Sequence, residues 1–281
     1  MSAQTITPEL QRWIVEQAKA GLTAEQVLQA MLKSGWDEAV AAQALAQSVA
    51  GFVPGQGLFL PVPSAVPEPD LSGSPPLLNA GDRAVGVLVS LQLPRLLVFG
   101  GLLSDEECDL MRAAAASRLA RSETVAASAD GSEVNAARTS EGMFFERGEN
   151  EICQRVEARI ARLLNWPVEN GEGLQVLRYR PGAEYLPHYD YFDPRHTSTP
   201  PILQRGGQRV ATLVMYLNTP EQGGATSFPD IGLEVAPIKG NAVFFSYDRP
   251  HPITQSLHGG APVLAGEKWV ATKWLRERRF E

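Results

Sequence analysis

The sequence contains only two cysteines in 281 residues, Cys108 and Cys153. They lack the close spacing that would indicate a metal clip or a redox pair. Both fall in segments with a helical pattern, so we expect two buried free thiols. Basic residues are scarce too, with 25 Lys and Arg against 32 Asp and Glu and a net charge of −7. Nucleic acid is therefore not an expected partner, because phosphate binding requires a basic surface.

Long apolar runs are also missing. None approaches the roughly 20 residues that a membrane-spanning helix needs. The first residues, Met1 to Arg12, are polar and lack the charged and apolar regions of a secretory signal. We therefore expect a cytoplasmic protein with no membrane partner. Hydrophobic residues still make up 44% of the chain, which is typical of a globular protein, and the length predicts one large domain with a small appendage.

Residues 1–50 are predicted to form a small three-helix bundle. Helix starts are marked by Thr7 with Pro8, by Thr23 with Gln26 and by Asp37, and helix ends by Gly21 and Gly35. In size and in its Gly35-Trp36 step the region resembles ubiquitin-associated-like modules. A helical appendage with no assigned partner is the favoured interpretation, and a module that binds a protein partner is the alternative.

Residues 51–84 are predicted to form a proline-rich linker. Their prolines favour extended, semi-rigid backbone, which suits either a free linker or a strap across the main domain. The apolar residues Phe59, Leu60 and Val62 indicate that part of this segment docks.

Residues 85–281 are predicted to form the main domain. Two strands separated by Pro94 precede a helix that opens at Ser104, and a second helix spans about 150–164. Further strands are expected at Leu174–Tyr179, Gln208–Leu217, Thr226–Phe228, Glu234–Pro237, Asn241–Tyr247 and Lys268–Leu275. Two helices with many short strands predict an α+β fold with a β-sandwich of the jelly-roll type.

The most informative residues lie in the last third of the chain. His188 and Asp190 form an H-x-D pair, and residues two apart on a strand face the same side. A distant histidine would complete a set of two imidazoles and one carboxylate, which leaves open positions on octahedral Fe(II). We choose His258, because His251 lies between two prolines in a loop.

A metal other than iron is an alternative for this set. Zinc also binds histidine and aspartate, although it prefers a closed tetrahedral shell in structural sites. Lys268 follows ten residues after His258 and supplies an ammonium group for an anionic co-substrate, which favours iron.

Several motifs together resemble the prolyl 4-hydroxylase branch of the Fe(II)- and 2-oxoglutarate-dependent oxygenases. The matching stretches are Leu103 to Cys108, Arg138-Thr139-Ser140, Gln175 to Tyr179, Gly223 to Pro229 and His258 to Trp274. The resemblance covers about two thirds of the chain, from Pro94 to Arg278. It implies a double-stranded β-helix with supporting helices.

The resemblance also implies the site and the reaction. His188, Asp190 and His258 would bind Fe(II), and Lys268, Tyr179 and Thr212 would bind 2-oxoglutarate. With O2 the enzyme would hydroxylate a prolyl residue in a peptide or protein and release succinate and CO2, with ascorbate as a further candidate cofactor.

The sequence indicates the substrate less clearly than it indicates the metal and co-substrate sites. Arg138, Glu172 and Tyr185 match family positions near the peptide groove, while a solvated surface role is the alternative for Arg138 and Glu172. The segment 191–207 has the composition of a lid, and Arg276 stands where relatives acting on collagen-like chains often carry His. Two other hypotheses are an oxygenase acting on a small molecule or a non-prolyl side chain, and an inert adaptor, which the intact set of His188, Asp190, His258 and Lys268 disfavours.

Overall fold

The computed structural model describes residues 4–19, 22–48, 61–121, 124–125, 132–133, 139–194, 196 and 198–281. The chain divides into two compact units, Met1–Ser64 and Ala65–Glu281. The second unit thus begins within the segment that the sequence assigns to the linker. In the part of the chain that the structure describes, no helix is both long and apolar enough to cross a membrane.

The first unit contains three helices, α1 (Pro8–Lys19), α2 (Ala24–Lys33) and α3 (Glu38–Ser48). The capping box expected before α2 is present, because Thr23 and Gln26 exchange side-chain and backbone hydrogen bonds. Asp37 caps α3 by accepting from the amides of Ala39 and Val40. The three helices share one apolar core, formed by Ile14, Ala24, Val27, Met31, Ala41, Ala44 and Leu45. Gly21, the expected end of α1, lies outside the described residues.

The segment from Ala65 to Pro76 is a strap on the second unit. The Glu68 amide donates to the Leu164 carbonyl at 3.0 Å, and the Glu68 carboxylate is paired with Arg95. The expectation that Val62 docks is wrong, since its side chain is 75% exposed. Phe59 and Leu60 lie outside the described residues. Pro67 and Pro69 are also buried, and Leu71 packs against the main core, so part of the segment docks through apolar contacts as well as through Glu68.

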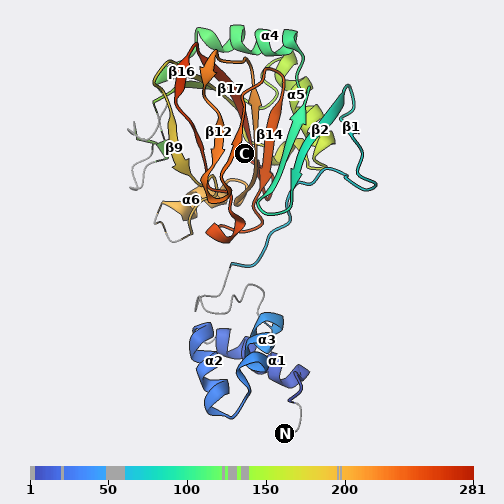
Figure 1. Cartoon of the computed structure of the whole chain (residues 1–281), viewed down its shortest axis with the longest axis vertical. Coiled ribbons are helices and arrows are strands. Elements are labelled where there is room, and N and C mark those ends of the chain that lie inside the picture. Colours follow the sequence, from blue (N-terminus) through green and yellow to red (C-terminus); the bar gives the residue numbers. More distant parts are fainter. Residues whose placement is uncertain are drawn as a thin grey trace. The chain divides into compact units, whose positions relative to one another are not determined.

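The second unit is built on antiparallel sheets, as the α+β prediction requires. A nine-stranded sheet has the order β1-β2-β3-β14-β10-β17-β8-β7-β4, and a four-stranded sheet has the order β13-β12-β15-β9. Figure 1 shows β1 and β2 at one end of the second unit and β9 at the other. The strands of the large sheet are β1 (Leu77–Asn79), β2 (Ala84–Leu91), β3 (Arg95–Gly100), β14 (Ala242–Ser246), β10 (Arg209–Tyr216), β17 (Lys268–Arg276), β8 (Leu174–Tyr179), β7 (Glu141–Phe145) and β4 (Ala120–Arg121).

The small sheet combines two strands expected from the sequence, β12 and β13, with two that were not among the expected strands, β9 and β15. Its members are β13 (Leu233–Val235), β12 (Thr226–Phe228), β15 (His258–Gly260) and β9 (Tyr185–His188). β9 and β15 have only four and three residues, too few for a pattern of alternation to stand out. Two further pairs are β11 (Gln222–Gly223) with β16 (Val263–Ala265) and β5 (Thr124–Val125) with β6 (Ser132–Glu133).

Both faces of the central strands of the large sheet, β14, β10, β17 and β8, are buried. One face packs against α4 (Asp105–Ala116) and α5 (Glu151–Leu163), which contribute Met111 and Ile160 to a core that includes Ala271 of β17. The other face shares a second core with the small sheet, where Val270 of β17 joins Phe228 of β12. Neighbouring residues of β17 thus belong to different cores, because side chains alternate across a strand.

A buried charge cluster joins α4, α5 and the loop before β2. Arg159 of α5 is 3% exposed and donates to both Glu107 and Asp82, with its closest contact 2.6 Å from the Glu107 carboxylate. Glu107 also accepts from the Ser104 amide in the capping box that opens α4. One guanidinium therefore links α4, α5 and the loop before β2.

We expect Arg159→Ala to lower the free energy of unfolding by about 3–5 kcal/mol, because it removes the cation that is hydrogen-bonded to the buried Glu107. Urea titration of the full chain measures this change. The control is Arg279→Ala, which removes an exposed pair with Glu281 and should cost at most about 1 kcal/mol. Equal losses in the two variants would contradict the structural importance of the cluster.

Candidate active site

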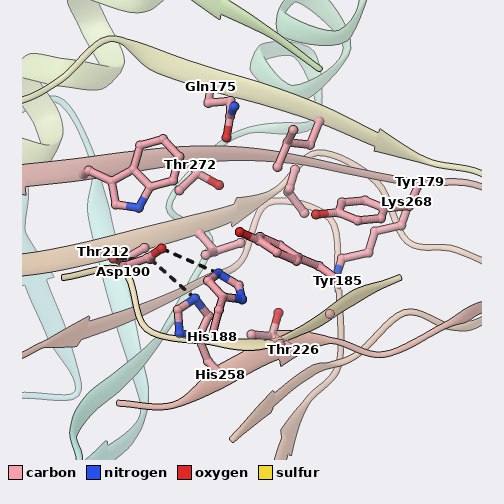
Figure 2. A pocket seen from close by; sticks show the side chains of 16 residues that line it. Gln175, Tyr179, Tyr185, His188, Asp190, Thr212, Thr226, His258, Lys268 and Thr272 are labelled. Carbon is pink, nitrogen blue, oxygen red and sulfur yellow. Dashed lines mark hydrogen bonds and ion pairs between the residues drawn. The ribbon is translucent and has the colours of Figure 1, made fainter. Parts of the chain in front are cut away.

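The pocket that contains the predicted metal and co-substrate residues lies between the two sheets and has a volume of about 440 Å³, part of it open to solvent. Three strands of the large sheet, β8, β10 and β17, line it on one side, and β9, β12 and β15 on the other. Figure 2 shows His188, Asp190 and His258 at one end and Lys268 with Tyr179 at the other.

The two histidines come together through strand pairing. β9 and β15 are antiparallel, with His188 directly opposite His258, and their rings are 4.4 Å apart between centroids. The Asp190 carboxylate lies 3.6 Å from Nε2 of His188 and 3.4 Å from Nε2 of His258. One ligand atom from each of the three residues lies within 4.8 Å of the others. This spacing suits a single metal ion.

Asp190 departs from the expected strand geometry. β9 ends at His188, so Asp190 follows the strand and does not share a strand face with His188. The side chain reaches the histidines from a bend in the chain. Its position must therefore depend on side-chain contacts, which the H-x-D pattern does not reveal.

Backbone carbonyl groups fix the orientation of both imidazoles. Nδ1 of His188 lies 2.9 Å from the Leu186 carbonyl oxygen, and Nδ1 of His258 lies 3.0 Å from the Ser256 carbonyl oxygen. A carbonyl oxygen only accepts, so each Nδ1 carries the proton. Each Nε2 then keeps a lone pair directed toward Asp190, the arrangement typical of metal-binding histidines.

The ionisation of His188 and Asp190 also suits a metal. Burial, followed by the charge of His258, lowers the pKa of His188 and favours its neutral form. Burial alone would raise the pKa of Asp190, but the attraction of His258 and the contacts with both histidines outweigh it and bring the pKa well below its usual range. Neutral imidazole and ionised carboxylate are the forms that bind divalent metals.

The other two histidines lie elsewhere. His251 caps the short 3-10 helix η3 (Pro252–Thr254) by accepting from the Ile253 amide. Among the described residues, His196 belongs to no group of metal-binding side chains, and the set of His188, Asp190 and His258 is the group found.

Lys268 lies buried at the far end of the pocket. It is 3% exposed, and its Nζ is 5.4 Å from the centroid of the Tyr179 ring, which pairs with it across β17 and β8. Burial lowers the pKa of Lys268 to about 8. Among the described residues no carboxylate lies within ion-pair distance of this ammonium group. The charge therefore faces the pocket without a counter-ion from the described part of the chain, which suits an anionic ligand.

Thr212 lies at the opposite end from Lys268. Its hydroxyl donates to the Asp190 carboxylate at 2.7 Å and lies 2.9 Å from the Tyr247 hydroxyl. Figure 2 shows Thr212 beside Asp190. The Thr212 hydroxyl therefore bonds to Asp190 at the metal end of the pocket, and its contact with 2-oxoglutarate stays a prediction. Thr226, which the sequence analysis did not select, also lines the pocket and accepts from the Tyr216 hydroxyl at 2.8 Å.

The three candidates for substrate contact, Tyr185, Glu172 and Arg138, differ in their position relative to the pocket. Tyr185 lines the pocket and stacks on His188, with 3.7 Å between ring centroids. Glu172 is 8% exposed, so the surface alternative is wrong for it. Its carboxylate accepts from Arg209 at 2.7 Å and lies outside the pocket lining. Arg138 lies outside the described residues.

The predicted lid segment contains a short helix, α6 (Thr199–Gln204). Arg276 is 2% exposed and donates to the carbonyl groups of Ile202, Arg205 and Gly207. These contacts tie the end of the segment to the last residue of β17. Arg276 therefore has a structural partner in this segment, which the sequence analysis did not foresee.

Strand alternation identifies pocket residues that the sequence analysis missed. On β17, Val270, Thr272 and Trp274 line the pocket with Lys268. On β8, Gln175 and Leu177 do so with Tyr179. Counting by two from the residues already selected would have found them, because such residues share a strand face.

Comparisons with known proteins agree with this geometry. The model of the 2OG-Fe(II) oxygenase superfamily matches residues 174–276. Over 209 residues the chain is 38% identical to prolyl 4-hydroxylase 5 of Arabidopsis thaliana. The aligned region covers 67% of this chain and 70% of that protein. Over 203 residues it is 42% identical to prolyl 4-hydroxylase 1 of the same plant, covering 66% and 70%.

A solved structure is similar as well. The 2OG complex of the viral collagen prolyl hydroxylase from Paramecium Bursaria Chlorella virus-1 is 32% identical, covers 64% of this chain and 94% of that chain, and superimposes with a TM-score of 0.51. By the extent and identity of these matches, the chain belongs to the prolyl 4-hydroxylase family of 2OG-Fe(II) oxygenases.

Proposed function

We propose that this chain is a prolyl 4-hydroxylase that uses Fe(II), 2-oxoglutarate and O2 to hydroxylate a prolyl residue in a peptide or protein, with succinate and CO2 as the other products. The observation that carries the proposal is the placement of the His188, Asp190 and His258 group and the buried Lys268 at opposite ends of one pocket. The family membership supports the reaction.

The residues fit Fe(II). Two imidazoles with free Nε2 lone pairs and one ionised carboxylate form the ligand set of non-haem iron oxygenases, and they leave coordination positions open. When bound, the iron would supply oxygen activation coupled to oxidation of 2-oxoglutarate. The part of the protein is to hold His188, Asp190 and His258 at fixed positions around it.

The far end of the pocket fits a dicarboxylate. The Lys268 ammonium group would pair with the distal carboxylate of 2-oxoglutarate, and this ion pair offsets the cost of burying both charges. Tyr179 lies opposite Lys268 across the two strands and would add its hydroxyl group. The co-substrate would then reach from Lys268 to the metal end.

The arrangement of sheets supports a double-stranded β-helix for the second unit. A large and a small antiparallel sheet face each other across a shared apolar core, with the pocket between them. The first residues of β15 and β17, His258 and Lys268, both line this pocket.

Tyr185 is the weaker candidate best placed to contact the substrate. Its ring is partly exposed and stacks on His188 next to the metal position. We propose that it packs against the prolyl ring and directs the reacting carbon toward the metal.

The proposed activity is tested by incubating the full chain with Fe(II), 2-oxoglutarate, O2 and a library of proline-containing peptides. We expect a peptide to gain one oxygen on proline for each succinate formed, read by mass spectrometry. Succinate formation that no peptide stimulates would instead favour a small molecule or a non-prolyl side chain. Absence of the weak visible band of the anaerobic Fe(II) and 2-oxoglutarate complex would contradict the site itself.

Loss of a metal ligand should abolish turnover. We expect Asp190→Ala and His258→Ala each to lower the rate of peptide hydroxylation by more than roughly 100-fold. Replacing a residue that only supports a metal ligand typically costs roughly 10- to 100-fold, and a ligand itself should cost more. His251→Ala is the matched control, because this histidine caps η3 away from the metal group, and it should keep most of the activity. An active Asp190→Ala enzyme would remove Asp190 from the proposed ligands.

Binding of 2-oxoglutarate should depend on the protonation of Lys268. With its pKa at about 8, Lys268 is cationic below that pH and neutral above it. The dissociation constant of 2-oxoglutarate should therefore rise above pH 8, by up to about tenfold per pH unit. Titration across this range measures it. Lys268→Arg stays protonated and should flatten the profile, and an equally steep rise in this variant would contradict the assignment.

A further inference from the structure

A chain of three buried side chains leads from the core to Asp190. The Tyr247 hydroxyl lies 2.9 Å from the Thr212 hydroxyl, which donates to Oδ2 of Asp190 at 2.7 Å. Thr212 and Tyr247 are at most 1% exposed, and Asp190 is 7% exposed. Solvent therefore offers these groups little competition for their hydrogen bonds.

The direction of the hydrogen bonds follows from the number of protons. A threonine hydroxyl has one proton, and Thr212 donates it to the Asp190 carboxylate. The contact between Thr212 and Tyr247 therefore uses the tyrosine proton. Each hydroxyl donates toward Asp190, and an unbroken series of donors ends on the carboxylate.

Asp190 needs such support more than its two neighbours do. His188 and His258 lie on paired strands, and a backbone carbonyl accepts from Nδ1 of each ring. Asp190 lies beyond the end of β9, so strand pairing does not set its position. The hydroxyl of Thr212, on the central strand β10, is the contact that ties the carboxylate to the large sheet.

Tyr247 supports the same bend through its ring. It directly follows β14, and its amide donates to the Val210 carbonyl at 2.9 Å. Its ring meets Tyr191, the residue after Asp190, edge-on with 6.0 Å between centroids. The tyrosine thus holds both the carboxylate, through Thr212, and the backbone that carries it.

We propose that Thr212 and Tyr247 are positioning residues that orient the Asp190 carboxylate for the metal. This inference rests on the proposed function, because it assumes a metal bound by Asp190. It gives Thr212 a role at the metal end of the pocket. Hydrogen bonds to ligating carboxylates orient them before the metal arrives.

The chain contains a matched comparison. Tyr216 is also buried, and its hydroxyl donates to Thr226 at 2.8 Å. This second pair of tyrosine and threonine hydroxyls does not reach Asp190. Tyr247→Phe and Tyr216→Phe therefore delete the same group from equally buried sites, and only the first deletion acts on the proposed ligand.

The test is a Mn²⁺ titration of the full-length protein, following the electron paramagnetic resonance signal of the free ion. We expect Thr212→Val to raise the dissociation constant of Mn²⁺ by roughly 10- to 100-fold. Thr212→Ser keeps the hydroxyl and should recover most of the loss. Tyr247→Phe should weaken binding to an intermediate degree, while Tyr216→Phe should leave it unchanged.

Several outcomes would overturn the inference. Unchanged Mn²⁺ binding in Thr212→Val would do so, and so would equal losses in the two tyrosine variants. If circular dichroism shows that Thr212→Val is unfolded, the test relies on the comparison of Mn²⁺ binding by Tyr247→Phe and Tyr216→Phe. If the unmodified protein binds no Mn²⁺, the proposed metal site fails first, which separates that result from a failure of the positioning residues.

Discussion

The site depends on one constraint, the alternation of side chains across strands that are buried on both faces. β17 supplies Ala271 to the core under α4 and α5, while Lys268, Thr272 and Trp274 face the pocket. Every residue of β17 is buried, so each side chain must suit either the core or the pocket. A shift of one residue in the register of β17 would exchange the two faces. The chemistry of the pocket is therefore fixed by the same pairing that builds the core.

Buried charges show how the fold separates structural from functional groups. Lys273 lies on the helix-facing side of β17 and pairs with Glu157 of α5 at 2.5 Å. Lys268 lies on the other face of the same strand, and the described residues offer it no carboxylate at ion-pair distance. Burying a cation without a partner costs free energy. A lysine buried in this way beside a pocket therefore indicates a group that binds an anionic ligand.

Local signals in the sequence predicted much of this structure. Capping residues placed α2, α3 and α4, and alternation placed β8, β10 and β17 close to their observed bounds. The H-x-D pattern and Lys268 pointed to the groups that the fold brings into one pocket. The bend at Asp190 and the contact with Thr212 were not predictable, because they depend on how β10 meets a segment 22 residues away. The burial of Glu172 was not predictable for a similar reason, since its partner Arg209 is 37 residues away.

The order of strands in the large sheet has a consequence for synthesis of the chain. β17 follows every other strand in sequence, yet it lies between β10 and β8 near the middle of the sheet. A growing chain that has already made His188, Asp190 and His258 still lacks the strand that carries Lys268. Pairings between such distant segments form slowly, because their loop-closure entropy is lost before the contacts form. The pocket therefore becomes complete only when the last strand inserts, so an unfinished chain carries potential metal ligands without a finished oxidising site.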